Sequence, residues 1–220
     1  MSAVILDAPR LRVTEIFLSL QGESATVGIP TVFVRLTGCP LRCRYCDTGY
    51  AFRGGESVEL DEVLTRITAF DTPQVTVTGG EPLAQPGCIS LLQRLCDAGF
   101  RVSLETSGAI DVSQVDERVV KVMDLKTPGS GEVERNRYEN IEYLGAGDEV
   151  KFVICDRADY DWARQRMAEF DLASRCTVLM SPSHGRQDAR QLAEWVLGDR
   201  LPVRFQVQLH KILWGDEPGR

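Results

Sequence analysis

Residues 37–48 read TGCPLRCRYCDT and bring three cysteines, Cys39, Cys43 and Cys46, into one short loop. The spacing C-x3-C-x2-C suits a single metal centre and leaves that centre one ligand short. Zinc in a structural site takes a fourth protein ligand, usually Cys or His, and the two histidines of the chain lie far from the loop in sequence. A 4Fe–4S cluster with three cysteine ligands keeps one open iron, so the loop favours such a cluster.

The composition predicts an ordinary globular chain. Its 220 residues are enough for one domain, and we expect residues 1–220 to form a single one. The formal net charge of −7 repels phosphate backbones, so we expect no direct nucleic-acid partner. No apolar run approaches the ~18 residues of a membrane span, and we expect no membrane association. Residues 1–7 lack a basic start and reach an acid after four apolar residues, which does not suit a signal peptide.

The remaining cysteines indicate a reducing compartment. Seven is an odd number, which argues against a disulfide framework, and we expect a cytoplasmic protein. Outside the loop, Cys88, Cys96, Cys155 and Cys176 lie in helix-like stretches or beside apolar runs. Because free cysteine behaves as a small hydrophobe, we expect these four in the core.

Short β-rich runs alternate with several amphipathic stretches. The predicted strands are residues 31–37, 74–78, 101–106, 119–125, 149–155, 177–180 and 204–209. The predicted helices are residues 60–70, 88–98, 159–170 and 188–197, with Gly99 as the stop of the second. Such alternation implies parallel β-α units, and six to seven of them in a short chain predict an α/β fold, a partial (incomplete) TIM-like β/α barrel.

Glycines and polar residues recur where these strands end. They occur at residues 38–39, 78–82, 105–108, 124–126 and 181–183. In β/α barrels the carboxyl ends of the strands form the rim on which active sites are built. The pattern therefore predicts an enzyme.

The cysteine loop resembles the signature of the radical S-adenosylmethionine (SAM) superfamily, in which an aromatic residue, here Tyr45, precedes the last cysteine. Residues 78–82, TGGEP, resemble the second motif of that superfamily, in which glycines let the backbone approach SAM and Glu81 holds the turn. The resemblance implies that the open iron binds SAM and passes it an electron, giving a 5′-deoxyadenosyl radical.

Three further segments resemble the 7-carboxy-7-deazaguanine synthases of queuosine and 7-deazapurine biosynthesis. They are EIFLSLQGE at residues 15–23, CDT at 46–48 and QVQLHK at 206–211, with Arg35 ahead of the first cysteine. Two alternatives stay open. The glycyl-radical-enzyme activating enzymes have a similar cysteine loop, and a non-catalytic zinc-binding module remains a reading of the cysteines alone.

The synthase resemblance implies a radical SAM carbon–nitrogen lyase. The substrate would be 6-carboxy-5,6,7,8-tetrahydropterin. The pyrazine ring of this substrate would contract with loss of ammonia, and SAM would be used catalytically. The resemblance also implies Mg²⁺, a homodimer and an electron donor such as flavodoxin or ferredoxin.

The same resemblance assigns site residues. The cluster ligands are Cys39, Cys43 and Cys46, and the Mg²⁺ ligand is Thr48. The substrate-binding residues are Leu20, Gln21, Gly22, Arg35, Thr78 and His210. The SAM-binding residues are Tyr45, Cys46, Asp47, Gly80, Asp124, Leu125 and Lys126.

Plainer roles compete for some of these residues. Residues alternate along strand 31–37, so Arg35 shares a face with Phe33 and needs an acidic partner, whether the substrate carboxylate or Glu15 or Glu105. Thr48 suits a helix cap as well as a Mg²⁺ ligand. Gln21 and Gly22 could form a plain polar turn instead of contacting the substrate. His210 could likewise be hydrogen-bonded to the backbone instead of to the substrate.

Overall fold

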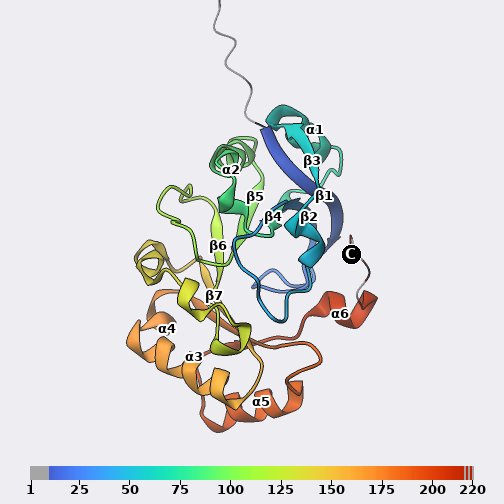
Figure 1. Cartoon of the computed structure of the whole chain (residues 1–220). Coiled ribbons are helices and arrows are strands. Elements are labelled where there is room, and N and C mark those ends of the chain that lie inside the picture. The colour runs from blue at the N-terminus through green and yellow to red at the C-terminus, as the bar shows by residue number, and fades with distance from the viewer. Residues whose placement is uncertain (1–9, 216, 218, 220) are drawn as a thin grey trace, which may run out of the picture.

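The computed structural model describes residues 10–215, 217 and 219. Its nine strands form one sheet in the order β3-β1-β2-β4-β5-β6-β7-β8-β9 (Figure 1). They are β1 (Arg10–Leu20), β2 (Pro30–Leu36), β3 (Glu56–Glu59), β4 (Gln74–Gly79), β5 (Arg101–Thr106), β6 (Val120–Asp124), β7 (Glu149–Ile154), β8 (Thr177–Pro182) and β9 (Arg204–Phe205). The segment 1–7, for which we expected no signal peptide, lies outside the described residues.

The sheet confirms the predicted incomplete barrel. β2 and β4 to β9 run parallel, each pairing with the next. β1 and β3 are antiparallel additions at one edge, which the predicted pattern of β-α units did not contain. Within residues 10–215 the order begins at β3 and ends at β9 without a pairing between them, so the barrel stays open.

Helices cover the outer face of the sheet. They are α1 (Leu60–Thr68), α2 (Gly87–Asp97), α3 (Arg157–Glu169), α4 (Leu172–Arg175) and α5 (Ala189–Gly198). A further helix, α6 (Leu209–Trp214), belongs to neither apolar cluster. The side chains of Asp156 and Asp188 accept hydrogen bonds from backbone N–H groups in the first turns of α3 and α5. Gly99, with φ of 87°, follows the last residues of α2 and confirms the predicted stop.

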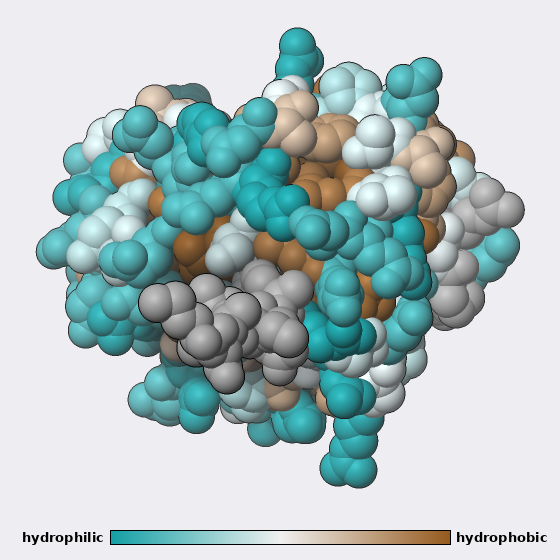
Figure 2. All heavy atoms as spheres, turned by 90° about the horizontal axis from the view of Figure 1, so that it is seen from above, coloured by the Kyte–Doolittle hydropathy of each residue, from teal (hydrophilic) through white to brown (hydrophobic). Residues whose placement is uncertain are grey.

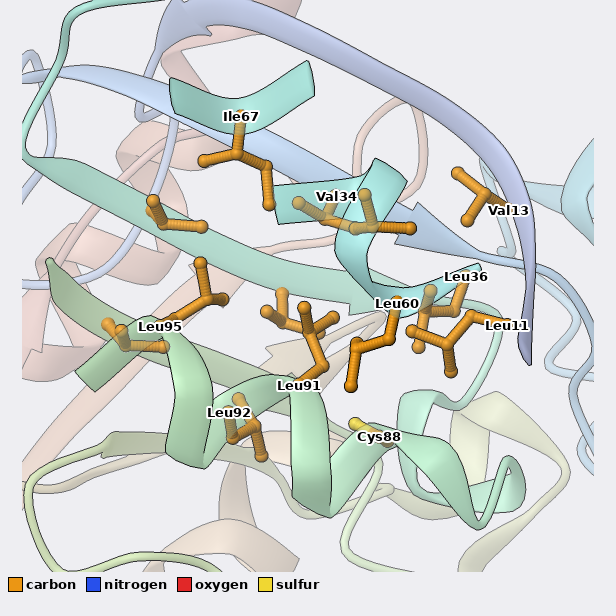
Figure 3. Close-up of a cluster of buried hydrophobic side chains, with 14 of the residues drawn as sticks. Leu11, Val13, Val34, Leu36, Leu60, Ile67, Cys88, Leu91, Leu92 and Leu95 are labelled. Carbon is orange, nitrogen blue, oxygen red and sulfur yellow. The ribbon is translucent and has the colours of Figure 1, made fainter. Parts of the chain in front are cut away.

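Two apolar clusters hold these layers together. The first lies between α1, α2 and the strands from β1 to β5, where Leu91 and Leu95 of α2 are fully buried with Val34 and Leu36 of β2 (Figure 3). The second lies under α3, α4 and α5. Each fully buried leucine stabilises the fold by ~1.5–3 kcal/mol. Because the clusters occupy the outer face, the inner face of the sheet is left for polar side chains.

Two connections lack the predicted alternation of strand and helix. β5 and β6 are joined by residues 107–119 without a helix, and β6 and β7 by the 3-10 turns η3 (Pro128–Ser130), η4 (Val133–Arg135) and η5 (Tyr138–Tyr143). The buried Asn140 compensates, because its amide donates to the carbonyls of Gly108 and Ile110 and accepts from Val112 N–H.

The predicted strand 204–209 is wrong beyond its second residue. β9 is only Arg204–Phe205, and α6 begins at Leu209. Leu209 N–H donates to the carbonyl of Gly22 at 2.9 Å, so the chain leaves the sheet edge and crosses to the loop after β1. Figure 1 shows α6 in red near the end of that loop.

The four cysteines outside the loop are placed unequally. Cys88 and Cys176 belong to the two apolar clusters, and Cys96 packs against the first. Cys155 is half-buried and belongs to neither cluster, so its predicted core position is wrong. It follows the last residue of β7, where the strand meets the polar rim.

The face of the molecule seen from above carries mainly hydrophilic side chains. Seen from above, hydrophobic side chains gather in the middle of one face and hydrophilic ones surround them (Figure 2). No helix in the described part of the chain is both long and apolar enough to cross a membrane.

Candidate active site

A cavity of about 490 Å³ opens at the carboxyl ends of the parallel strands. Nearly every site residue predicted from the sequence lines this cavity. Lining it are Leu20, Gln21, Gly22, Arg35, Cys39, Cys43, Tyr45, Cys46, Asp47, Thr48, Thr78, Gly80, Asp124, Lys126 and His210. Its volume falls in the usual range for small-molecule sites, ~300–1,000 Å³.

The three loop cysteines face this cavity together. Buried Leu41 anchors the loop, and its N–H donates to Cys39 Sγ at 3.4 Å. Arg44 N–H donates to the carbonyl of Ser130 at 2.9 Å, which ties the loop to the turn after β6. Burial raises the pKa of Cys43 to about 11 in the metal-free protein. Such thiols become cluster ligands when the positive charge of iron offsets the cost of burying thiolates.

The donor set fits a cluster better than a single ion. His184 and His210 line the same cavity as the cysteines, although they lie far from the loop in sequence. Their distance along the sequence was therefore no argument that they lie far from the cysteines in space. Even so, no group of three or more His, Cys, Asp or Glu side chains among the described residues is arranged to hold one metal ion. Zinc needs such a compact set. A four-iron cluster is larger than one ion, and its cysteine ligands stand farther apart.

The glycines after β4 serve the packing of the chain itself. A Cβ on Gly79 would lie 2.5 Å from Leu36 O, and one on Gly80 would lie 2.0 Å from Gly38 O. Glycine is therefore required because the ends of β2 and β4 approach each other closely. The expected reason, room for SAM, is not needed to explain these two residues.

Glu81 holds this turn, as expected. Its fully buried carboxylate accepts from Thr106 Oγ1, Ser107 Oγ and the N–H groups of Ser107 and Leu83, at 2.5 to 3.1 Å. The carboxylate thus fixes the end of β4 against the end of β5.

Arg35 lies on the inner face of β2, and Val34 on the outer face belongs to the core, as the alternation predicted. Its Nε donates to Glu15 Oε1 at 2.6 Å, so the Glu15 ion pair that the sequence left open is present. Burial lowers the pKa of Arg35, but the hydrogen bond and charge of Glu15 outweigh burial and raise it. The guanidinium therefore remains charged in a half-enclosed position.

Gln21 is built into the cavity wall. Its Nε2 is 3.2 Å from both Thr76 Oγ1 and Glu105 Oε1, and its Oε1 accepts from Glu23 N–H. Thr78 Oγ1 donates to the other Glu105 oxygen at 3.0 Å. Glu105 therefore joins two of the predicted substrate contacts. The sequence placed Glu105 at a polar strand end and as a possible partner of Arg35, but did not include it among the predicted site residues.

Gly22 and His210 are in direct contact. A Cβ on Gly22 would lie 2.2 Å from His210 Nδ1, so the imidazole packs against the bare backbone of the loop. Together with the hydrogen bond from Leu209 N–H to Gly22 O, this contact fixes the start of α6 beside the cavity. The two residues come from opposite ends of the sequence.

Thr48 precedes the 3-10 helix η1 (Gly49–Phe52) but does not cap it with its side chain, so the capping alternative is wrong. Its Oγ1 lies 3.7 Å from Cys46 Sγ. Asp47 does not cap either; its carboxylate lies 3.9 Å from Lys211 Nζ. Both oxygen-bearing side chains border the cavity, as hard-cation ligands would.

Buried charges alternate along the opposite wall. Lys126 Nζ lies 2.9 Å from Asp124, and Lys151 Nζ lies 3.7 Å from Asp124 and 2.8 Å from Glu23. Burial raises the pKa of Asp124, but the two lysines outweigh it and lower the value. Asp124 Oδ1 and Glu23 Oε1 are buried without a hydrogen-bond partner among the described residues. Two acceptors are thus left for ligands.

Two residues on this wall differ from the sequence prediction. Leu125 does not line the cavity, because its side chain is fully buried in the second apolar cluster and only its neighbours face inward. Lys151, which the sequence did not single out, does line it. A lone lysine within an apolar strand is the signal that could have found it. The Tyr45 hydroxyl is buried and unpaired in the described part of the chain.

An incomplete β/α barrel with three cysteines and an open cavity at the strand ends is the architecture of a radical SAM enzyme. The model of the radical SAM superfamily matches residues 33–126. The chain is 46% identical over 215 residues to the 7-carboxy-7-deazaguanine synthase of Chlorobaculum tepidum, covering 96% of this chain and 97% of the relative. It is 42% identical to that of Koribacter versatilis, covering 94% and 98%. The chain therefore belongs to the 7-carboxy-7-deazaguanine synthase family of radical SAM enzymes.

The fold has a solved counterpart. The crystal structure of QueE from Escherichia coli superposes with a TM-score of 0.75 and 22% identity, covering 91% of this chain and 95% of the other. That likeness concerns the fold. The family assignment does not favour the activating-enzyme alternative.

Proposed function

We propose that the chain converts 6-carboxy-5,6,7,8-tetrahydropterin to 7-carboxy-7-deazaguanine, with loss of ammonia and catalytic use of SAM. Family membership supports this reaction. The observation that carries it at the level of residues is the shared cavity, which the three loop cysteines, Arg35 and the carboxylates of the opposite wall line together. The cavity unites a radical-generating site with a site for an anionic, hydrogen-bonding ring.

Cys39, Cys43 and Cys46 would hold the 4Fe–4S cluster. Bound there, the cluster and SAM supply reversible removal of a hydrogen atom from the substrate. The residues Tyr45, Asp47, Gly80, Asp124, Leu125 and Lys126 would surround SAM, with Leu125 restricted to backbone contact. The free Asp124 Oδ1 suits the ammonium group of SAM, because a buried carboxylate oxygen without a donor is costly.

Arg35 would bind the substrate carboxylate, since a guanidinium can bind it through two parallel hydrogen bonds. Thr48 would contribute to a Mg²⁺ site completed by substrate and water. Leu20, Gln21, Gly22, Thr78 and His210 would hold the pterin ring. Their task is to fix one carbon of the substrate against the radical source and to exclude water.

Four broader features complete the proposal. We expect one domain, since a single sheet runs through the described chain, and a cytoplasmic location, since all seven cysteines are free thiols. A homodimer is supported by exposed apolar side chains such as Leu18 and Ile29. An electron donor such as flavodoxin or ferredoxin would reach the cluster beside exposed Arg42 and Arg44, which flank Cys43.

One anaerobic assay tests the function. Reconstituted protein should be brown, with about four irons per chain, and with dithionite, SAM, Mg²⁺ and the carboxytetrahydropterin it should form the deazapurine while SAM is conserved. The Cys46→Ala variant is the inactive control. A colourless zinc protein, or consumption of SAM without the deazapurine, would overturn the proposal.

A further inference from the structure

Arg35 is held at one end of its guanidinium only. Its Nε donates to Glu15 Oε1 at 2.6 Å, and these residues face each other directly across the antiparallel pair β1–β2. Within the described residues this is the one hydrogen-bonded ion pair that Arg35 makes. Its two terminal nitrogens carry the N–H groups that can bind a carboxylate side by side, and neither has a hydrogen-bond partner among the described residues.

Tyr50 secures the same carboxylate oxygen. Its hydroxyl donates to Glu15 Oε1 at 2.7 Å, so two donors, Tyr50 Oη and Arg35 Nε, meet on one oxygen of Glu15. The rings of Tyr50 and Phe17 each lie 5.9 Å from Arg35 Cζ. The guanidinium is thus held at Nε by Glu15 and flanked by two rings.

Glu15 and Tyr50 stand behind the site rather than in it. Phe17, Phe33 and Arg35 line the cavity, whereas Glu15 and Tyr50 do not. Phe17 and Phe33 stack on each other at 5.2 Å, which makes this part of the wall a rigid aromatic surface. A ligand in the cavity therefore meets Arg35 without touching the carboxylate that orients it.

We propose that Glu15, assisted by Tyr50, is a positioning residue that aims the terminal N–H groups of Arg35 into the cavity and so selects a carboxylated substrate. The inference rests on the proposed function, because it takes Arg35 as the carboxylate site. An arginine released from Glu15 has several rotatable bonds and is drawn toward other acids, of which Glu105 already acts on its charge. Its terminal nitrogens then lose their fixed direction.

The test compares Glu15→Ala, Glu15→Gln and Tyr50→Phe with the control Glu59→Gln. Glu59 also pairs with an arginine, Arg10, but on the exposed strand β3. KM and kcat are measured with the carboxytetrahydropterin, and Kd is measured for that compound and for the tetrahydropterin lacking the carboxylate. Glu15→Ala should weaken binding of the carboxylated compound by about tenfold, which equals ~1.4 kcal/mol.

The compound without the carboxylate should bind all variants equally. Glu15→Gln should lose less than Glu15→Ala, since its amide oxygen still accepts from Nε, and Tyr50→Phe should lose least. Equal weakening of both compounds would indicate general damage and overturn the proposal. Unchanged or tighter binding of the carboxylated compound would also overturn it, because Glu15 would then be idle or a competitor.

The failure of the inference can be told apart from failure of the proposed function. If wild-type protein forms no deazapurine, the function is wrong, but the two Kd values still test the positioning role. If Glu15→Ala does not fold, Glu15→Gln and Tyr50→Phe give the same comparison. A ratio of the two Kd values equal to that of wild type in both variants would refute the positioning role of Glu15.

Discussion

Gly80→Ala should destabilise the protein and loosen the cluster loop. The added Cβ would stand 2.0 Å from Gly38 O, 2.5 Å from Gly38 C and 3.0 Å from Cys39 Cβ. The nearest atoms are backbone, so no side-chain rotation relieves the overlap, and one strand end must move by about 1 Å or more. The moving segment carries the first cysteine of the loop.

The magnitude follows from two losses. Overpacking costs ~1–3 kcal/mol. The hydrogen bond from Glu81 N–H to Gly38 O, now 2.7 Å, is strained or lost for a further ~1 kcal/mol. We therefore expect a free energy of unfolding lower by about 2–4 kcal/mol, which for a chain of this size lowers Tm by roughly 5–15 °C.

Gly147→Ala is the matched control. No atom lies within 4 Å of a Cβ there, and its φ is not in the left-handed region. Both variants are compared with wild type by urea unfolding of the metal-free protein and by iron content after anaerobic reconstitution. Gly80→Ala with wild-type stability and full iron would refute the argument that these glycines permit the contact between the ends of β2 and β4.

Three further changes test other parts of the site. Gly22→Ala should displace the ring of His210, since the new Cβ would lie 2.2 Å from Nδ1; we expect a KM about tenfold higher, and an unchanged KM would contradict the contact. Thr48→Ala should abolish stimulation by Mg²⁺ while Tm stays within about 2 °C, because the side chain makes no capping bond; Thr48→Ser should retain the stimulation. For Asp124 the folded pKa is below the unfolded one, so its stabilising effect is present above the unfolded pKa of about 3.9 and is lost as pH falls through the folded value. In Asp124→Asn the free energy of unfolding, measured with urea, should depend less on pH over that acid range. An unchanged pH dependence would show that the lysines do not act on this carboxyl.

How far the sequence predicted the molecule depends on whether the signal was local. The strand 101–106 matches β5 at both ends, because apolar runs and glycine stops are properties of neighbouring residues. The antiparallel strand β1 went unpredicted as a strand, since its polar and apolar residues do not make the buried pattern of a parallel strand. The helix α6 was missed because a long-range hydrogen bond to Gly22 directs the chain there.

The site divides in the same way. Motif spacing found the cysteines, Arg35 and Thr78, all of which face the cavity. It could not find that Lys151 links Glu23 to Asp124, because these three residues meet only when β6, β7 and the loop after β1 are assembled. Motif spacing also could not distinguish glycines that allow two chain segments to pack from glycines that make room for a ligand. That distinction requires knowing which atoms a Cβ added to each glycine would meet.

The polar groups of the cavity indicate what it must bind. Asp124 and Glu23 each give one oxygen to a lysine and keep the other buried without a donor in the described part of the chain. Arg35 likewise gives one nitrogen to Glu15, and its two terminal nitrogens have no hydrogen-bond partner within the part of the chain that the structure describes. Each of the two buried carboxylate oxygens without a donor costs ~1–3 kcal/mol. The protein therefore holds its acceptors and its donors half-satisfied, on separate walls. A ligand set with N–H donors for the acidic wall recovers that energy, and a carboxylate in the same set pairs with the charge of Arg35; a purely anionic ligand offers the acidic wall no donor and leaves the cost in place.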